Sequence, residues 1–169
     1  MSAAPIGVVV VNHNTAALLD ACLSSVRDAL ASAGWADRAE VVVVDNASAD
    51  DSVAFVRRHH PWVRLIASDV NLGFTAANNL ALGPWSDGGA PCPQRILLLN
   101  PDAALRPGAL ATLAAVLDAE PRTAVVGPSL RYPDGRFQHA AFRFPGLVQT
   151  ALDLWPVARL ADSPLNGRY

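Results

Sequence analysis

Apolar runs of strand length alternate with helical patterns over most of the chain. The strands are continuous apolar runs, a pattern typical of parallel strands that are buried on both faces. The sequence therefore predicts an α/β fold with a mainly parallel sheet and helices on both faces of it. The predicted strands lie near 6–12, 40–45, 63–67 and 95–99, and the predicted helices near 15–33, 52–59, 74–82 and 107–120.

The pattern changes in the last third of the chain. We predict a fifth strand at 123–127, a hairpin turn at 132–136 and a short apolar helix at 147–154. A loop rich in Gly and Pro is expected earlier, at 83–93. These patterns predict one domain over 1–147, followed by a poorly patterned tail over 148–169. The late appearance of antiparallel features leads us to expect a chain truncated before a further subdomain.

Polar side chains directly follow three of the predicted strands. The carboxyl ends of parallel strands meet at one edge of a sheet, where open α/β folds bind their ligands. A single Asn or Asp in such a place is explained by a turn alone, but three in register predict a polar site. The residues are Asn12 and Asn14 after the first strand, Asp45 and Asn46 after the second, and Asn100 and Asp102 after the fourth.

Several common phosphate-binding and catalytic motifs are absent from the sequence. The turn after the first strand has no Gly-x-Gly-x-x-Gly, and the chain contains neither a P-loop nor a Gly-x-Ser-x-Gly elbow. All 13 basic residues are Arg, which excludes a P-loop Lys. The phosphates of a nucleotide would therefore need a cation. Asp102 suits a hard divalent ion such as Mg2+, although a turn in which Asp102 only caps local backbone is an equally open interpretation.

Composition excludes some classes of partner. Hydrophobic residues make up 51% of the chain, charged residues 17%, and the net charge is -2, so we expect no nucleic-acid partner. The apolar run 6–11 is too short for a signal peptide or a membrane span. We expect a cytoplasmic protein, and peripheral association with the inner face of a membrane stays an open alternative. Cys22 and Cys92 have no metal-ligand spacing, and Cys22 is expected to be a buried thiol.

Four short motifs occur in one order along the chain. Together they resemble the nucleotide-sugar half of a family 2 glycosyltransferase with the GT-A fold, and specifically the rhamnosyltransferase-like subgroup. A segment at 133–139 and the later Phe144-Pro145 are similar to the continuation of that subgroup, so the resemblance covers roughly 6–147. The motifs are Asn12-His13-Asn14, Asp45-Asn46-Ala47-Ser48, Asn71-Leu72-Gly73-Phe74 with Asn79, and Asn100-Pro101-Asp102.

The resemblance implies a role for each matching position. Asp102 would carry the Mg2+ or Mn2+ ion that bridges the donor diphosphate, and Asp45 would accept from N3–H of uracil or thymine. Asn12 and Asn14 would line the base and ribose pocket, whereas Ser48 and Asp50 are predicted to be helix caps. Asn71, Gly73 and Asn79 would approach the ribose and diphosphate. The full substrate-binding set implied is Asn12, Asn14, Asp45, Asn46, Asn71, Gly73, Asn79 and Asn100.

The function implied is that of an inverting glycosyltransferase in cell-wall or polysaccharide biosynthesis. It would transfer a sugar, with L-rhamnose as one candidate, from a dTDP- or UDP-sugar to a glycan or lipid-linked acceptor. The general base of the family comes later, in an acceptor half, and neither Asp134, Asp153 nor Asp162 matches it. A catalytically incomplete nucleotide-binding module that needs a partner chain is therefore the alternative. A sugar-phosphate nucleotidyltransferase is a third hypothesis, against which the glycine-free turn at 12–14 argues.

Overall fold

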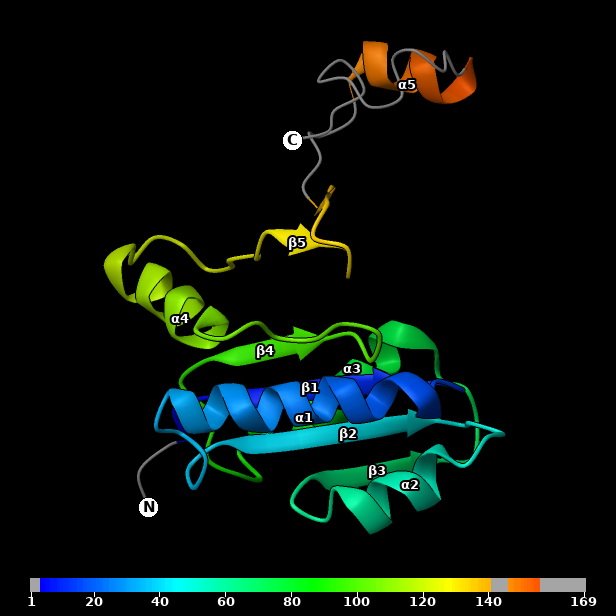
Figure 1. The fold of residues 1–169 in the computed structure, drawn as a ribbon, viewed down its shortest axis with the longest axis vertical. Coiled ribbons are helices and arrows are strands. Elements are labelled where there is room, and N and C mark those ends of the chain that lie inside the picture. Colours follow the sequence, from blue (N-terminus) through cyan, green and yellow to red (C-terminus); the bar gives the residue numbers. More distant parts are fainter. Residues whose placement is uncertain (1–3, 141–145, 156–169) are drawn as a thin grey trace. The chain divides into compact units, whose positions relative to one another are not determined.

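Strands and helices alternate along the first of two units into which the chain divides, residues 1–124 and 125–169. The computed structural model describes residues 4–140 and 146–155. The elements of the first unit (Figure 1) are β1 (Gly7–Asn12), α1 (Ala16–Ser32), β2 (Glu40–Asn46), α2 (Ser52–His59), β3 (Arg64–Ser68), α3 (Gly73–Ser86), β4 (Ile96–Leu99) and α4 (Ala109–Ala119).

The four strands of this unit form a parallel sheet in the order β3-β2-β1-β4. In its register Val10 of β1 lies opposite Val43 of β2 and Leu99 of β4, and Asn12 lies opposite Asp45. All four strands therefore end at the same edge of the sheet. The parallel sheet predicted from the apolar runs is confirmed.

Helices cover both faces of the sheet, as predicted (Figure 1). Helix α1 packs Leu19, Leu23 and Val26 onto one face, and α2 and α4 add side chains to the same core. Helix α3 covers the other face with Ala77 and Ala81. The valines of β1 and β2 alternate between these two cores, which explains why their sequences are continuous apolar runs rather than alternating ones.

Strand β4 differs from the two central strands in its burial. Leu97 and Leu99 pack against the core beneath α1, but Ile96 and Leu98 on the other face are 45% and 50% exposed. β4 pairs only with β1 among the described strands, and α3 contacts β1 and β2. An apolar run does not reveal this difference, because it reads the same at the centre of a sheet and at its margin.

Helix α3 is longer than the sequence predicts. It continues through Gly83 and Pro84 to Ser86, so the expected loop does not begin at residue 83. Trp85 in the last turn of α3 is 3% exposed and packs into the core on this face of the sheet, and its indole N–H donates to Glu40 Oε2 at 2.9 Å. A side chain added at Gly7 would lie 2.5 Å from the Trp85 ring. This tertiary packing outweighs the helix-breaking tendency of Gly and Pro.

The strand predicted at 123–127 is wrong, because the backbone there forms no regular element. Val125 and Val126 have high strand propensity, but propensity is effective only when a neighbouring strand provides pairing, and Val125 is 85% exposed. The prediction that the domain boundary lies at 147 stays a prediction.

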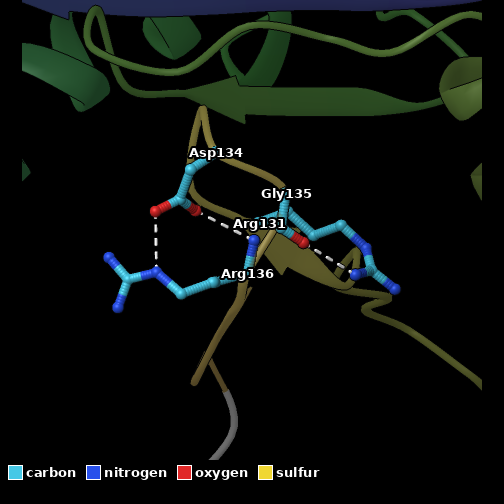
Figure 2. Close-up of polar contacts among 4 residues, drawn as sticks. All are labelled: Arg131, Asp134, Gly135 and Arg136. Atoms are coloured by element: carbon cyan, nitrogen blue, oxygen red, sulfur yellow. Dashed lines mark hydrogen bonds and ion pairs between the residues drawn. The ribbon is translucent and has the colours of Figure 1, made fainter.

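The second unit contains a two-stranded antiparallel hairpin, β5 (Leu130–Arg131) and β6 (Phe137–Gln138), and helix α5 (Leu147–Leu154). Figure 2 shows the turn, in which Asp134 accepts from the backbone N–H and Nε of Arg136 and Arg131 donates to the Gly135 carbonyl. The predicted hairpin and the predicted helix at 147–154 are both confirmed. Among the described residues, every helix is too short or too polar to cross a membrane.

Candidate functional site

Two polar side chains meet at the carboxyl ends of the central strands. Asn12 Nδ2 donates to Asp45 Oδ1 at 2.8 Å, and both residues are buried, with Asn12 0% and Asp45 2% exposed. Ser48 completes the group, because its hydroxyl donates to Asp45 Oδ1 at 2.7 Å and its backbone N–H donates to Oδ2 at 3.0 Å. Asp45 Oδ2 thus accepts one hydrogen bond from the described residues, and its second lone pair can accept another.

The loops that follow β1 and β2 are hydrogen-bonded to each other. The backbone N–H of Asn14 donates to Ser48 Oγ at 2.9 Å, and the N–H of Ala49 donates to Asn14 Oδ1 at 2.7 Å. Asn14 and Ala47 both adopt left-handed backbone, with φ of 56° and 62°. Ala rarely adopts this conformation, so the surrounding hydrogen bonds must hold Ala47 in it.

His13 belongs to the loop after β1, and both of its ring nitrogens have hydrogen-bond partners. Its Nδ1 is 2.9 Å from the Asn46 carbonyl, which can only accept, so Nδ1 carries the proton. Nε2 then accepts from Asn14 Nδ2 at 3.2 Å, and the Asn14 amide is oriented by the bond from Ala49 to its oxygen. These partners assign His13 the neutral tautomer protonated on Nδ1.

Asp50 caps two helices, which confirms its predicted capping role. Its carboxylate accepts from the backbone N–H of Ala16, the first residue of α1, and from that of Ser52, the first residue of α2. The hydrogen bond from the Ser52 hydroxyl, followed by that from Ala16, holds the pKa of Asp50 below its ordinary value. The cap predicted for Ser48 is wrong, because Ser48 instead bonds to Asp45, Asn12 and Asn14.

Asn46 fixes the loop that leads into α3. It is 3% exposed, and its Nδ2 donates to Asn71 Oδ1 at 2.9 Å while its Oδ1 accepts the N–H of Leu72 at 2.8 Å. Asn71 Oδ1 also accepts the N–H of Gly73 at 2.9 Å, and Gly73 has a φ of 76°. Both Asn side chains therefore hold backbone in place at the beginning of α3.

Asp102 follows β4 in a tight turn. The N–H of Ala103 donates to the Asn100 carbonyl at 3.1 Å, which makes Asp102 the third residue of that turn. The Asp102 side chain is exposed and has no hydrogen bond or ion pair with another described residue. No group of three His, Cys, Asp or Glu side chains that could hold a metal occurs among the described residues. One free carboxylate nevertheless fits Mg2+ or Mn2+, because such ions take one or two protein carboxylates together with substrate phosphates.

Cys22 of α1 lies beneath this turn. Its thiol donates to the Asn100 carbonyl at 3.6 Å and is 1% exposed. Burial, together with the negative charge of Asp102, raises the pKa of Cys22 to about 12. The buried thiol predicted from the sequence is confirmed. Its contact with the turn has no signal in the sequence, because residues 78 positions apart are joined only by the fold.

The structure thus brings together part of the predicted site. Asn12 contacts Asp45, Asn46 contacts Asn71, and Asn14 joins the first pair through Ser48. Asn79 is exposed on α3, and its role, like the ligand contacts of the whole set, stays a prediction. Sequence reasoning assigned Ser48 to the wrong role because Ser is common both at helix caps and in buried hydrogen-bond networks.

The chain is similar to known proteins both in its sequence and in its fold. The model of the family described as Glycosyl transferase family 2 matches residues 7–154. A curated relative, the N-acetylglucosaminyl-diphospho-decaprenol L-rhamnosyltransferase of Mycobacterium tuberculosis, is 27% identical over 132 residues. The match covers 69% of this chain and 41% of that relative, so the chain spans about two fifths of its length.

Solved structures have the same fold. The mannosyltransferase PcManGT from Pyrobaculum calidifontis, in complex with GDP-Man and Mn2+, is similar with a TM-score of 0.59 and 25% identity. That match covers 79% of this chain and 37% of the other chain. S. aureus TarS 1-349 is similar with a TM-score of 0.55 and 19% identity, over 73% of this chain and 38% of that one. These glycosyltransferases place the sheet described above in the GT-A fold.

Proposed function

Since this chain belongs to glycosyl transferase family 2, we propose that it binds the donor in an inverting, metal-dependent transfer of a sugar from a nucleoside diphosphate. The observation that carries the proposal is the order of the strands. β1 lies between β2 and β4, so Asp45 and Asp102 follow strands about 10 Å apart at one edge of the sheet. A nucleoside and its diphosphate can bridge that span, with the base at Asp45 and the phosphates at Asp102.

The donor in this proposal carries uracil or thymine. The free acceptor direction of Asp45 Oδ2 would take the imide N3–H of such a base, while Asn12 and Ser48 hold the carboxylate still. Asn14 would lie beside the base or ribose, with Asn46, Asn71, Gly73 and Asn79 beside the ribose and diphosphate. The similar structures include TarS 1-349 complexes with UDP and with UDP-GlcNAc, which support a uracil nucleotide.

Asp102 would hold Mg2+ or Mn2+, and Asn100 at the beginning of the same turn would contact the substrate. When bound, the cation would neutralise negative charge that develops on the leaving diphosphate. The exposed carboxylate of Asp102 supports this role, because it forms no hydrogen bond or ion pair with another described residue. The Mn2+ in the PcManGT complex supports a divalent cation in this fold.

The acceptor in this proposal is a glycan or a lipid-linked glycan, and L-rhamnose is one candidate sugar. The name of the Mycobacterium tuberculosis relative supports both, since that protein is an L-rhamnosyltransferase of a decaprenol-linked substrate. Such an acceptor also favours a cytoplasmic protein that associates peripherally with a membrane. The acceptor hydroxyl would attack the anomeric carbon as the diphosphate leaves, with a general base taking its proton.

Nucleotide titration tests the proposal directly. Calorimetry would compare UDP, dTDP and GDP, each with Mn2+, with Mg2+ and with a chelator. We expect UDP or dTDP to bind more tightly than GDP, and either cation to strengthen binding. Asp102→Asn should remove the metal-dependent gain and leave binding in chelator unchanged. Equal affinity with and without cation would contradict the metal role, and a preference for GDP would contradict the assigned base.

A further inference from the structure

The segment from Asn100 to Leu105, which carries Asp102, is attached to helix α1 at two points. At its beginning, the Asn100 carbonyl accepts from Ala103 within the turn and from the thiol of Cys22 in α1. At its end, the backbone N–H of Leu105 donates to the hydroxyl of Ser25 in α1 at 2.9 Å. These two contacts bracket Asp102 in the sequence, and the Asp102 carboxylate itself has no such contact with the described residues.

Ser25 is itself well oriented for this contact. Its hydroxyl donates to the Cys22 carbonyl at 2.7 Å, which leaves the oxygen lone pairs directed at Leu105. Cys22 and Ser25 are three residues apart, so they lie on neighbouring positions of one helix face. The same helix buries Leu23 and Val26 in the core, which makes α1 a rigid support for the turn.

We propose that Ser25 is a positioning residue for the metal-binding carboxylate of Asp102. The inference rests on the proposed function, since it assigns Ser25 a part in the cation and diphosphate site. Without the hydroxyl, Leu105 N–H loses its acceptor and the second attachment of the turn is lost. Asp102 then samples more positions, and cation binding weakens while contacts to the base at β2 are unaffected.

Matched substitutions in α1 test this role. Ser25→Ala removes the acceptor, Ser25→Cys replaces it with a weaker acceptor of similar shape, and Ser25→Thr retains the hydroxyl. Ser24→Ala is the control, because Ser24 is the neighbouring serine and has no side-chain hydrogen bond with a described residue. Each 169-residue variant would be titrated with UDP in Mn2+ and in chelator, with bound Mn2+ followed by electron paramagnetic resonance and folding by thermal unfolding.

We expect Ser25→Ala to weaken Mn2+ binding in the presence of UDP about 3- to 10-fold, the effect of one neutral hydrogen bond. UDP affinity in chelator should not change, Ser25→Cys should lie between Ala and the parent, and Ser25→Thr and Ser24→Ala should match the parent. If Ser25→Ala does not fold, the comparison of Cys with Thr decides in its place.

Two results would overturn the inference in distinguishable ways. If Mn2+ strengthens UDP binding to the parent and equally to Ser25→Ala and Ser25→Cys, Ser25 has no positioning role and the proposed function stands. If Mn2+ does not strengthen UDP binding to the parent, the proposed metal site fails and the role of Ser25 fails with it. A loss of UDP affinity that is equal in Mn2+ and in chelator would show a general structural effect, which also contradicts the inference.

Discussion

Asp50 accepts the backbone N–H of Ala16 through Oδ2 and the N–H of Ser52 through Oδ1, although Ala16 lies 34 residues earlier in the chain. A single carboxylate thus satisfies the first N–H groups of α1 and α2. The N-termini of these two helices adjoin the predicted nucleotide site, because both follow the strand-end loops that hold Asn12 and Asp45. One exposed acid therefore fixes two of the segments that frame the site.

The lowered pKa of Asp50 predicts a pH dependence of stability. Because hydrogen bonds from Ser52 and Ala16 hold the native pKa of Asp50 below its ordinary value of about 3.8, Asp50 stabilises the fold above pH 4. That contribution is lost as the pH falls through the native pKa. Asp50→Asn should lower the melting temperature at pH 7 and reduce its loss between pH 5 and pH 2. Asp51→Asn is the control, since Asp51 makes no side-chain cap, and identical profiles for the two variants would contradict the role.

Asp45 should distinguish uracil from cytosine. Uracil offers an N–H at N3, whereas cytosine offers an acceptor there, and a carboxylate can only accept. We expect the parent to bind UDP more tightly than CDP, and Asp45→Ala to lose about 1–3 kcal/mol of that preference. Calorimetry with both nucleotides measures the difference, and thermal unfolding shows whether the variant is folded. A parent that does not discriminate between UDP and CDP would reduce Asp45 to the structural partner of Asn12.

Replacing Ala47 with glycine should stabilise the fold. Its φ of 62° costs an L-residue roughly 1–2 kcal/mol, and glycine offsets part of the gain through its larger unfolded-state entropy. Ala47→Gly is therefore expected to raise the free energy of unfolding by about 0.5–1 kcal/mol in urea denaturation. Ala49→Gly, two residues later and not at positive φ, should instead lower it. Destabilisation by both substitutions would mean that Ala47 is not strained.

The two cysteines should differ sharply in reactivity. Cys22 is buried with a pKa raised to about 12, whereas Cys92 is exposed. Only the thiolate is nucleophilic, so at pH 8 iodoacetamide should modify Cys92 and leave Cys22 unmodified until the protein unfolds. Mass spectrometry of the native and urea-unfolded chain measures both sites, with Cys92→Ser as the control. Rapid native modification of Cys22 would show that the Asn100 turn opens readily.

The sequence predicts the parallel core well, because a run such as Val41–Val44 can be satisfied only by burial on both faces. It misplaces the end of α3, because Gly83 and Pro84 are local signals and the burial of Trp85 against Gly7 is not. The candidate site likewise contains residues that local sequence identifies and residues that only the fold identifies. Asn12 and Asp45 are recognisable as strand-end residues, but the part of Ser25 depends on a contact across 80 positions, which no local pattern contains.

The close approach of Trp85 to Gly7 has a consequence for local unfolding. The last turn of α3 contains Pro84, which has no backbone N–H to donate, so this turn depends on the packing of Trp85 against Gly7 and on its hydrogen bond to Glu40. Amide hydrogens at Ser86 and Asp87 should therefore exchange only when that packing is lost, rather than by simple fraying of a helix end. The exchange rates of these two amide hydrogens would then measure how often Trp85 separates from the beginning of β1 at Gly7.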